Sequence, residues 1–315
     1  MKIEQTMFYK YRSFSTTTLE SLCHDTVYFS SPSLFNDPLD CNPTLDCDSS
    51  KDELRDLLEF FVARRAEKEV LSGLSQAEVK GERAEQHALN TANGIAKKGL
   101  NDIAYQAKDP YYSDMEGDVE SWLLVSKIES EMNKHYEKGV CCFSTSYENP
   151  LLWSHYGDQH HGLCIGYSVN REPLPVLKEV VYDGKRSILT STLVKAFLVD
   201  DEHAKSELDR EVLLHKAGCW KYEKEWRLIS EQGVQDSPLL LEEVTFGLRC
   251  NSAVRHAVVS SLEGRDNDIK FYEMYIVRGS YELQRRLLDT CDLGTFLPNT
   301  AMSAEEMFGD INKYL

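Results

Sequence analysis

The feature that most limits the possible folds is a long helix-patterned segment lying between two β-rich parts of the chain. Residues 51–136 are rich in Glu, Lys, Arg, Ala and Leu, and apolar residues such as Leu54, Leu57 and Phe61 recur at helical spacing. Residues 1–48 instead have the pattern of strands and turns, and short β-patterned runs return after the helical segment. Strands at both ends with helices between them predict an α+β fold rather than a regular βαβ series.

The 315 residues are enough to bury a core without disulfides or metal. We expect one catalytic domain over residues 1–315, in which 51–136 is a helical insertion between core strands. A short helix or loop is expected at 149–161, mostly helical structure at 189–216, and a helix at 252–262. The expected strands are 7–11, 26–30, 140–144, 162–167, 180–182, 220–230, 239–248 and 271–277.

Charge and hydropathy restrict the function and the compartment. The net charge of −17 disfavours a protein that coats DNA or RNA, although a local basic site stays possible. No run of about 18 apolar residues exists, so we expect no membrane association. The first residues lack the apolar core of a signal peptide. These features lead us to expect a cytoplasmic protein.

The nine cysteines indicate neither a disulfide framework nor a zinc site. Their number is odd, they are scattered, and no pair has CxxC spacing. We expect reduced thiols, several of them in the core. His155, His160 and His161 lack the spacing of a metal motif, so no metal site is expected.

The segment Lys221–Arg227 contains the charged residues that most strongly suggest an active site. If it is a strand, alternation places Lys221, Glu223, Glu225 and Arg227 on one face, with neighbouring side chains about 7 Å apart. Charges at this spacing shift one another's pKa values and suit a polar active site. A solvated edge strand with cross-strand ion pairs would explain the same alternation.

Two other polar groups end apolar strands. Ser144 and Ser146 would share a face of a strand, where their hydroxyls can orient a carboxylate; a capped turn is the plain alternative. Arg12 closes an aromatic strand, and its planar guanidinium can hold a phosphate or carboxylate. An ordinary surface arginine fits that position as well.

Four motifs identify a resemblance to a widespread bacterial family of uncharacterised proteins. They are Tyr9-Lys10-Tyr11-Arg12-Ser13-Phe14, Phe29-Ser30-Ser31-Pro32 with Phe35-Asn36-Asp37-Pro38, Trp153-Ser154-His155-Tyr156 with His161-Gly162, and Tyr222-Glu223-Lys224-Glu225-Trp226-Arg227. In addition, an Arg strand, a Ser-Thr-Ser strand and a Glu-x-Glu strand in this order resemble ADP-ribosyltransferases of the Arg–Ser–Glu type. Compact toxin domains of that type lack an insertion like 51–136.

The second resemblance implies an ADP-ribosyltransferase-like split antiparallel or mixed sheet, with NAD as a substrate. It implies that Arg12 helps to hold NAD, that Ser144 supports the nicotinamide-ribose region, and that Glu225 contacts the ribose 2′-hydroxyl. Glu223 then takes the position that activates the acceptor. Cleavage of the nicotinamide–ribose bond passes through an oxocarbenium-like state, which a carboxylate stabilises by about 3 kcal/mol. We also expect Ser146 and Arg227 at this cofactor site.

The rings of His155 and Tyr156 can line a nicotinamide pocket, or can be ordinary packed residues. The segment 36–40 can approach a substrate, or can form an Asx-turn.

The resulting hypothesis is an ADP-ribosyltransferase that modifies a protein, RNA or DNA acceptor. A role as a toxin or antiphage effector, with an antitoxin or other neutralising partner, follows only from the family resemblance. A metal-independent ribonuclease that uses His155 with Glu225 and Arg227 is a second hypothesis. A non-catalytic nucleotide sensor is the third.

Overall fold

The structure is a computed structural model that describes residues 6–134, 136–265 and 267–290. The chain forms two compact units, and each is built from separate stretches of sequence. The first unit contains Met1–Asp25, Ser146–Pro173 and Pro238–Leu315, and the second contains Thr26–Thr145 and Leu174–Ser237. Strands and helices are mixed in both units, which confirms the α+β class. That the whole chain serves as one catalytic domain stays a prediction.

The first unit is built on a mixed sheet in the order β14-β13-β12-β5-β1. Neighbouring strands are antiparallel except β12 and β13, which are parallel. The strands are β1 (Phe8–Arg12), β5 (Leu163–Ser168), β12 (Leu240–Phe246), β13 (Lys270–Ile276) and β14 (Leu283–Leu287), and the helices are α1 (Thr16–His24), α5 (Pro150–His155) and α8 (Ser252–Leu262).

Helix α1 corrects the prediction that residues 1–48 contain only strands and turns. Its three threonines have low helix propensity, so the sequence pattern is weak. Capping at both ends of the helix stabilises it where helix propensity does not. The Ser15 side chain accepts a hydrogen bond from the backbone N–H of Thr18, and Asp25 closes the helix in the left-handed conformation.

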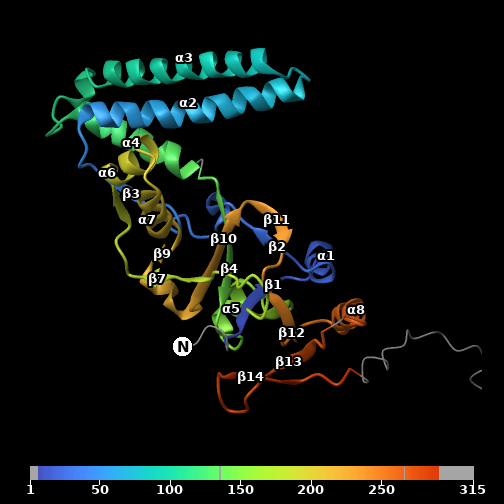
Figure 1. The fold of residues 1–315 in the computed structure, drawn as a ribbon. Coiled ribbons are helices and arrows are strands. Elements are labelled where there is room, and N and C mark those ends of the chain that lie inside the picture. Colours follow the sequence, from blue (N-terminus) through green and yellow to red (C-terminus); the bar gives the residue numbers. More distant parts are fainter. Residues whose placement is uncertain (1–5, 135, 266, 291–315) are drawn as a thin grey trace, which may run out of the picture. The chain divides into compact units, whose positions relative to one another are not determined.

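The second unit contains the segment that was expected to be helical. Residues 51–134 form α2 (Lys51–Gln76), α3 (Glu82–Gln106), the 3₁₀ turn η3 (Pro110–Tyr112) and α4 (Val119–Lys134). A capping box starts α2, because Ser50 and Glu53 each bond the other's backbone N–H. Later in the chain come α6 (Thr190–Leu193), the π-helical turn η4 (Val194–Leu198) and α7 (Glu202–Leu213). Figure 1 shows α2 and α3 lying side by side.

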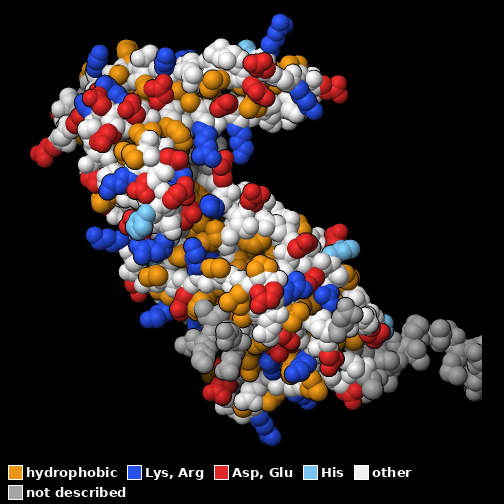
Figure 2. All heavy atoms as spheres, viewed as in Figure 1, with side chains coloured by type: hydrophobic (Ala, Val, Ile, Leu, Met, Phe, Trp, Pro, Cys, Tyr) orange, Lys and Arg blue, Asp and Glu red, His pale blue; other side chains and the backbone are white. Residues whose placement is uncertain are grey.

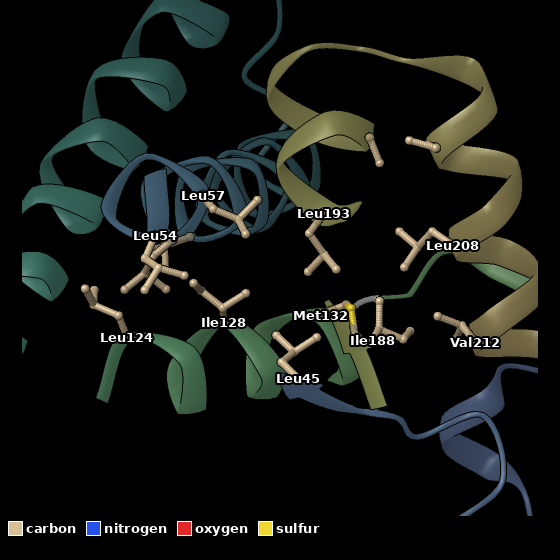
Figure 3. Close-up of a cluster of buried hydrophobic side chains, with 14 of the residues drawn as sticks. Leu45, Leu54, Leu57, Leu124, Ile128, Met132, Ile188, Leu193, Leu208 and Val212 are labelled. Carbon is tan, nitrogen blue, oxygen red and sulfur yellow. The ribbon is translucent and has the colours of Figure 1, made fainter. Parts of the chain in front are cut away.

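Apolar side chains from these helices form one core cluster. Figure 3 shows Leu54 and Leu57 of α2, Ile128 of α4, Leu193 of α6 and Leu208 of α7 pointing toward one another. Complete burial of each leucine stabilises the fold by about 1.5–3 kcal/mol. The helical segment is therefore held to its own unit by a packed core.

The strands of the second unit lie in one three-stranded sheet and three pairs. The sheet has the antiparallel order β4-β10-β6. The pairs are β2 with β11, β3 with β8, and β7 with β9. Their bounds are β2 (Thr26–Phe29), β3 (Thr44–Asp46), β4 (Lys138–Ser144), β6 (Lys178–Glu179), β7 (Val181–Tyr182), β8 (Ser187–Leu189), β9 (His215–Lys216), β10 (Glu225–Glu231) and β11 (Gly233–Asp236); a 3₁₀ helix, η2 (Pro32–Leu34), follows β2.

One predicted strand starts later than expected and another ends before Ser146, and both boundaries concern candidate site residues. Residues 218–223 form the 3₁₀ helix η5 (Gly218–Glu223), so the strand begins only at Glu225. Strand β4 ends at Ser144, so Ser146 lies outside it and in the first unit. The alternation argument therefore fails for the pair Glu223 and Glu225, and for the pair Ser144 and Ser146.

The surface charges, the helix lengths and the cysteines can be compared with what the sequence led us to expect. On the face drawn in Figure 2, acidic and basic side chains of the described residues are interspersed. No helix among the described residues is long and apolar enough to span a membrane. Every described cysteine is unpaired; Cys41, Cys141, Cys164 and Cys250 are buried, and the others are at least partly exposed. Cys291 lies outside the described residues.

Candidate active site

Five charged side chains of the second unit meet in its interior. They are the carboxylates Asp40, Glu223 and Glu225 and the cations Lys216 and Arg227, and their exposed fractions run from 0% for Arg227 to 9% for Lys216. We call this group the charge cluster. Its burial excludes the solvated edge strand that the alternation alone would allow. Buried charges persist only when they are paired and hydrogen-bonded.

Local structure explains why Glu223 and Glu225 meet despite the break in the strand. Glu223 is the last residue of η5, and Glu225 is the first of β10. Between them Lys224 has φ 47°, in the left-handed region. This one residue turns the backbone from the 3₁₀ helix into the strand. Both carboxylates reach the interior while Lys224 itself is exposed.

Lys216 links all three carboxylates. Its Nζ lies 2.6 Å from Glu223 Oε2, 2.8 Å from Glu225 Oε2 and 3.3 Å from Asp40 Oδ2. Lys216 ends β9, the two-residue strand that follows α7. No sequence motif singled out this lysine, and an isolated lysine after a helix gives no signal of burial.

Arg227 is held more tightly than Lys216. Its Nε donates to Glu225 Oε1 at 2.7 Å, and its Nη2 donates to Asp40 Oδ1 and Oδ2 at 2.9 and 2.8 Å. Its Nη1 donates to the Leu213 carbonyl at 2.7 Å. The Phe35 ring centroid lies 5.5 Å from the guanidinium carbon. These contacts fix the guanidinium in one plane.

The cluster has three carboxylates for two cations, so its formal charge is −1 when all five are ionised. Burial would raise the pKa of Glu225, but Arg227 and Lys216 outweigh it and lower that pKa. Burial would lower the pKa of Lys216, but Glu225, Asp40 and Glu223 raise it above its ordinary value. These three residues therefore stay charged at neutral pH: Glu225, Lys216 and Arg227.

Ser144 lies directly beside the two glutamates. In the antiparallel pairing of β4 with β10, Ser144 is opposite Glu225. The buried Ser144 hydroxyl donates to the Glu223 carbonyl at 2.5 Å. The Glu225 backbone N–H donates to the Tyr182 hydroxyl at 2.9 Å. The serine strand thus helps to fix the backbone from which both carboxylates extend.

The segment 35–40 completes the site, where 36–40 was expected to approach a substrate or to form an Asx-turn. The Leu39 N–H bonds Asp37 Oδ1 at 2.9 Å, which is the expected Asx-turn. This turn places Asp40 in the cluster. Asp37 Oδ2 also accepts a hydrogen bond from Trp220 Nε1 at 2.6 Å, and Lys216 Nζ lies 5.2 Å from the Trp220 ring centroid.

Four other predicted site residues belong to the first unit. Arg12 ends β1 and is partly exposed, and Ser146 is buried; the Ser146 carbonyl accepts a hydrogen bond from Tyr11 at 2.8 Å. His155, which ends α5, is exposed, and its ring centroid lies 6.1 Å from that of Tyr156. The structure thus brings Ser144, Glu223, Glu225 and Arg227 together in one unit, and places Arg12, Ser146, His155 and Tyr156 in the other.

One glycine of the first unit explains part of a motif. A Cβ on Gly162 would lie 2.2 Å from the Arg12 carbonyl oxygen. Only glycine allows the backbone to approach β1 so closely. The His161-Gly162 motif therefore shapes the end of the strand that carries Arg12.

Among the described residues, no group of three or more histidine, cysteine, aspartate or glutamate side chains is arranged to hold a metal ion. The lysine and arginine of the charge cluster occupy the positions where a metal would otherwise neutralise its carboxylates.

Comparison with known proteins gives one family. The family described as "Protein of unknown function (DUF2971)" matches residues 152–228. The matched segment runs from α5 into β10 and contains four of the five cluster residues, all except Asp40. No curated protein and no solved structure matches the chain. The family match covers this segment only, and the ADP-ribosyltransferase resemblance stays a prediction.

Proposed function

We propose that the chain is an NAD-dependent ADP-ribosyltransferase that modifies a macromolecular acceptor, with Glu225 as its central catalytic residue. The main support is the position of Glu225: it is ionised, lies opposite Ser144 on the neighbouring strand, and has Glu223 beside it. Two of the three Arg–Ser–Glu positions therefore meet at one point. The strand of Arg12 belongs to the first unit, and the strands of Ser144 and Glu225 belong to the second.

The charge of the cluster suits the proposed reaction. NAD carries a positive nicotinamide ring, and its ribose C1′ becomes more positive as the bond to nicotinamide breaks. The bonding electrons leave with nicotinamide, and an acceptor nucleophile then bonds C1′ and gives its proton to Glu223. Glu225 stabilises the developing positive charge at the ribose. A cluster with one surplus negative charge provides the field that this step needs.

Lys216 is the residue that has to move before Glu225 can face a ribose. Both oxygens of Glu225 are engaged: Oε1 accepts from Arg227 Nε, and Oε2 accepts from Lys216 Nζ at 2.8 Å and from Arg227 Nη2 at the longer distance of 3.2 Å. Arg227 is fixed by its other partners, whereas Lys216 is a point charge on a flexible stem. It can release Glu225 while it stays paired with Asp40. The cationic part of NAD then replaces the ammonium beside Glu225.

The first-unit residues take the remaining roles of this proposal. Arg12 holds the diphosphate by charge-assisted hydrogen bonds. Ser146 lies close in sequence to the serine strand, and the rings of His155 and Tyr156 contact nicotinamide. The acceptor is a protein, RNA or DNA. A toxin or antiphage role, with a neutralising partner, belongs to the same proposal.

The test uses the full chain, NAD labelled in its adenylate part, and fractionated cell extract. We expect label in a macromolecular fraction, reduced at least about a hundredfold by Glu225→Gln. Glu273→Gln is the matched control, because that strand carboxylate is also paired with arginines. Undiminished transfer by Glu225→Gln would overturn the proposal.

Two other outcomes would replace it. Cleavage of RNA without NAD, lost in His155→Ala, would indicate a ribonuclease. Binding of NAD with no release of nicotinamide, even with extract present, would indicate a nucleotide sensor.

A further inference from the structure

The connection between α3 and α4 carries a row of aromatic side chains that the proposed function does not use. The row consists of Tyr111 and Tyr112 of η3 and Trp122 of α4. The Tyr112 ring centroid is 5.2 Å from that of Tyr111 and 6.2 Å from that of Trp122. Tyr111 is 85% exposed and Trp122 is 50% exposed. Large aromatic residues grouped at a surface are typical of protein interfaces.

The same segment is strongly acidic. Residues 109–126 contain five carboxylates and no lysine or arginine. Asp118 and Glu120 pair with Lys51 and Arg55 of α2, whose start lies beside this connection in Figure 1. Within the described part of the chain, Asp109, Asp114 and Glu116 form no ion pair with a lysine or arginine. Negative charge next to exposed rings favours a cationic partner.

The first unit shows how such a set of side chains holds a guanidinium. Arg285 of β14 lies with its guanidinium carbon 4.0 Å from the Tyr147 ring centroid and 4.1 Å from that of Tyr272. Glu243 of β12 pairs with the same guanidinium. Two aromatic rings and one carboxylate thus suffice to bind an arginine side chain in this protein.

We propose that the aromatic row and its neighbouring carboxylates form a docking surface for an arginine-rich segment of a partner protein. Guanidinium groups stack on the exposed rings of Tyr111 and Trp122, and Asp109, Asp114 and Glu116 pair with them. Arginine is favoured over lysine because its planar group stacks on rings while it bonds carboxylates. Phosphate-bearing partners such as nucleic acids are disfavoured by the same carboxylates.

The test measures binding of the full chain to a fluorescent peptide of alternating arginine and glycine by fluorescence anisotropy. Tyr111→Ala/Trp122→Ala leaves the net charge unchanged, so it separates stacking from general attraction to an acidic protein. Two lost stacking contacts of about 0.5–1 kcal/mol each weaken binding about fivefold to thirtyfold. The control is Tyr281→Ala, which removes a fully exposed ring outside the row, and it is expected to bind as the unmodified chain does.

Further variants, a lysine peptide and a stability check complete the test. Tyr111→Ala alone removes the most exposed ring of the row, and thermal unfolding checks that each variant stays folded. Asp114→Asn/Glu116→Gln is expected to weaken binding as well, and the corresponding lysine peptide is expected to bind more weakly. Unchanged affinity in Tyr111→Ala/Trp122→Ala, or preference for a single-stranded oligonucleotide over the peptide, would overturn the proposal.

Discussion

The two units differ in how they pair an arginine that lies on a strand. In the first unit, Arg285 pairs with Glu243, and two tyrosine rings enclose it. In the second, Arg227 and Lys216 face three carboxylates inside a closed cluster. The first arrangement is balanced and needs nothing further. The second has a surplus carboxylate, and in the proposed function this surplus serves a cationic substrate.

The largest expected effect comes from removing the arginine of each arrangement. Arg227→Met leaves three buried carboxylates with one lysine, and we expect it to lower the free energy of unfolding by about 3–5 kcal/mol. Arg285→Met leaves a single carboxylate beside polar tyrosines, in a place where the arginine side chain is already 16% exposed. We expect it to cost about 1–3 kcal/mol.

Urea unfolding at pH 7, followed by tryptophan fluorescence and circular dichroism, measures both losses. Equal losses in the two variants would show that the charge cluster is an ordinary ion pair, and the contrast between the units would disappear.

A smaller effect is expected from Lys216, and it tests the charge count itself. Lys216→Met raises the surplus from one negative charge to two, so stability falls. Adding Glu223→Gln restores the original count without restoring the ion pair. We expect this second change to recover about 1–2 kcal/mol, a coupling in the range found for residues that share one network.

The measurement is a double-mutant cycle of unfolding free energies on the two single variants and the double variant. Glu223→Gln alone removes the surplus carboxylate and keeps Lys216, so it supplies the fourth corner. Strictly additive losses would contradict the charge-balance account.

The sequence predicted some of this contrast and missed the rest, for physical reasons. Hydrophobic periodicity predicted the helical segment and most of the strands, because burial follows repeating patterns. It could not predict η5, since the turn depends on Lys224 adopting positive φ, which lysine rarely does. Lys216 and Asp40 join the cluster only through folding, and no local pattern marks either as buried.

The Ser144–Glu225 pair and Arg285 are two further examples of contacts that local sequence patterns do not predict. That the serine and glutamate strands would meet was expected only from a family resemblance, and the structure places the two residues opposite each other. Strand β14, which carries Arg285, was not predicted at all. Leu283 is its one buried residue and the four that follow are exposed or half-buried, so its apolar pattern is weak.

The smallest expected effect is on the pH dependence of stability. The folded pKa of Glu225 lies below that of an unfolded glutamate, about 4.3, so the unfolded chain binds the proton first as pH falls. Its contribution to stability is therefore complete above about pH 5 and is lost progressively as the pH falls toward the folded pKa of about 2. Each pH unit in that range costs at most about 1.4 kcal/mol from this group.

Glu225→Gln cannot take up the proton, so its unfolding free energy should fall less steeply between pH 5 and 3. Urea unfolding of both chains across that range gives the two slopes, and parallel curves would mean that Glu225 is not held ionised by Arg227 and Lys216.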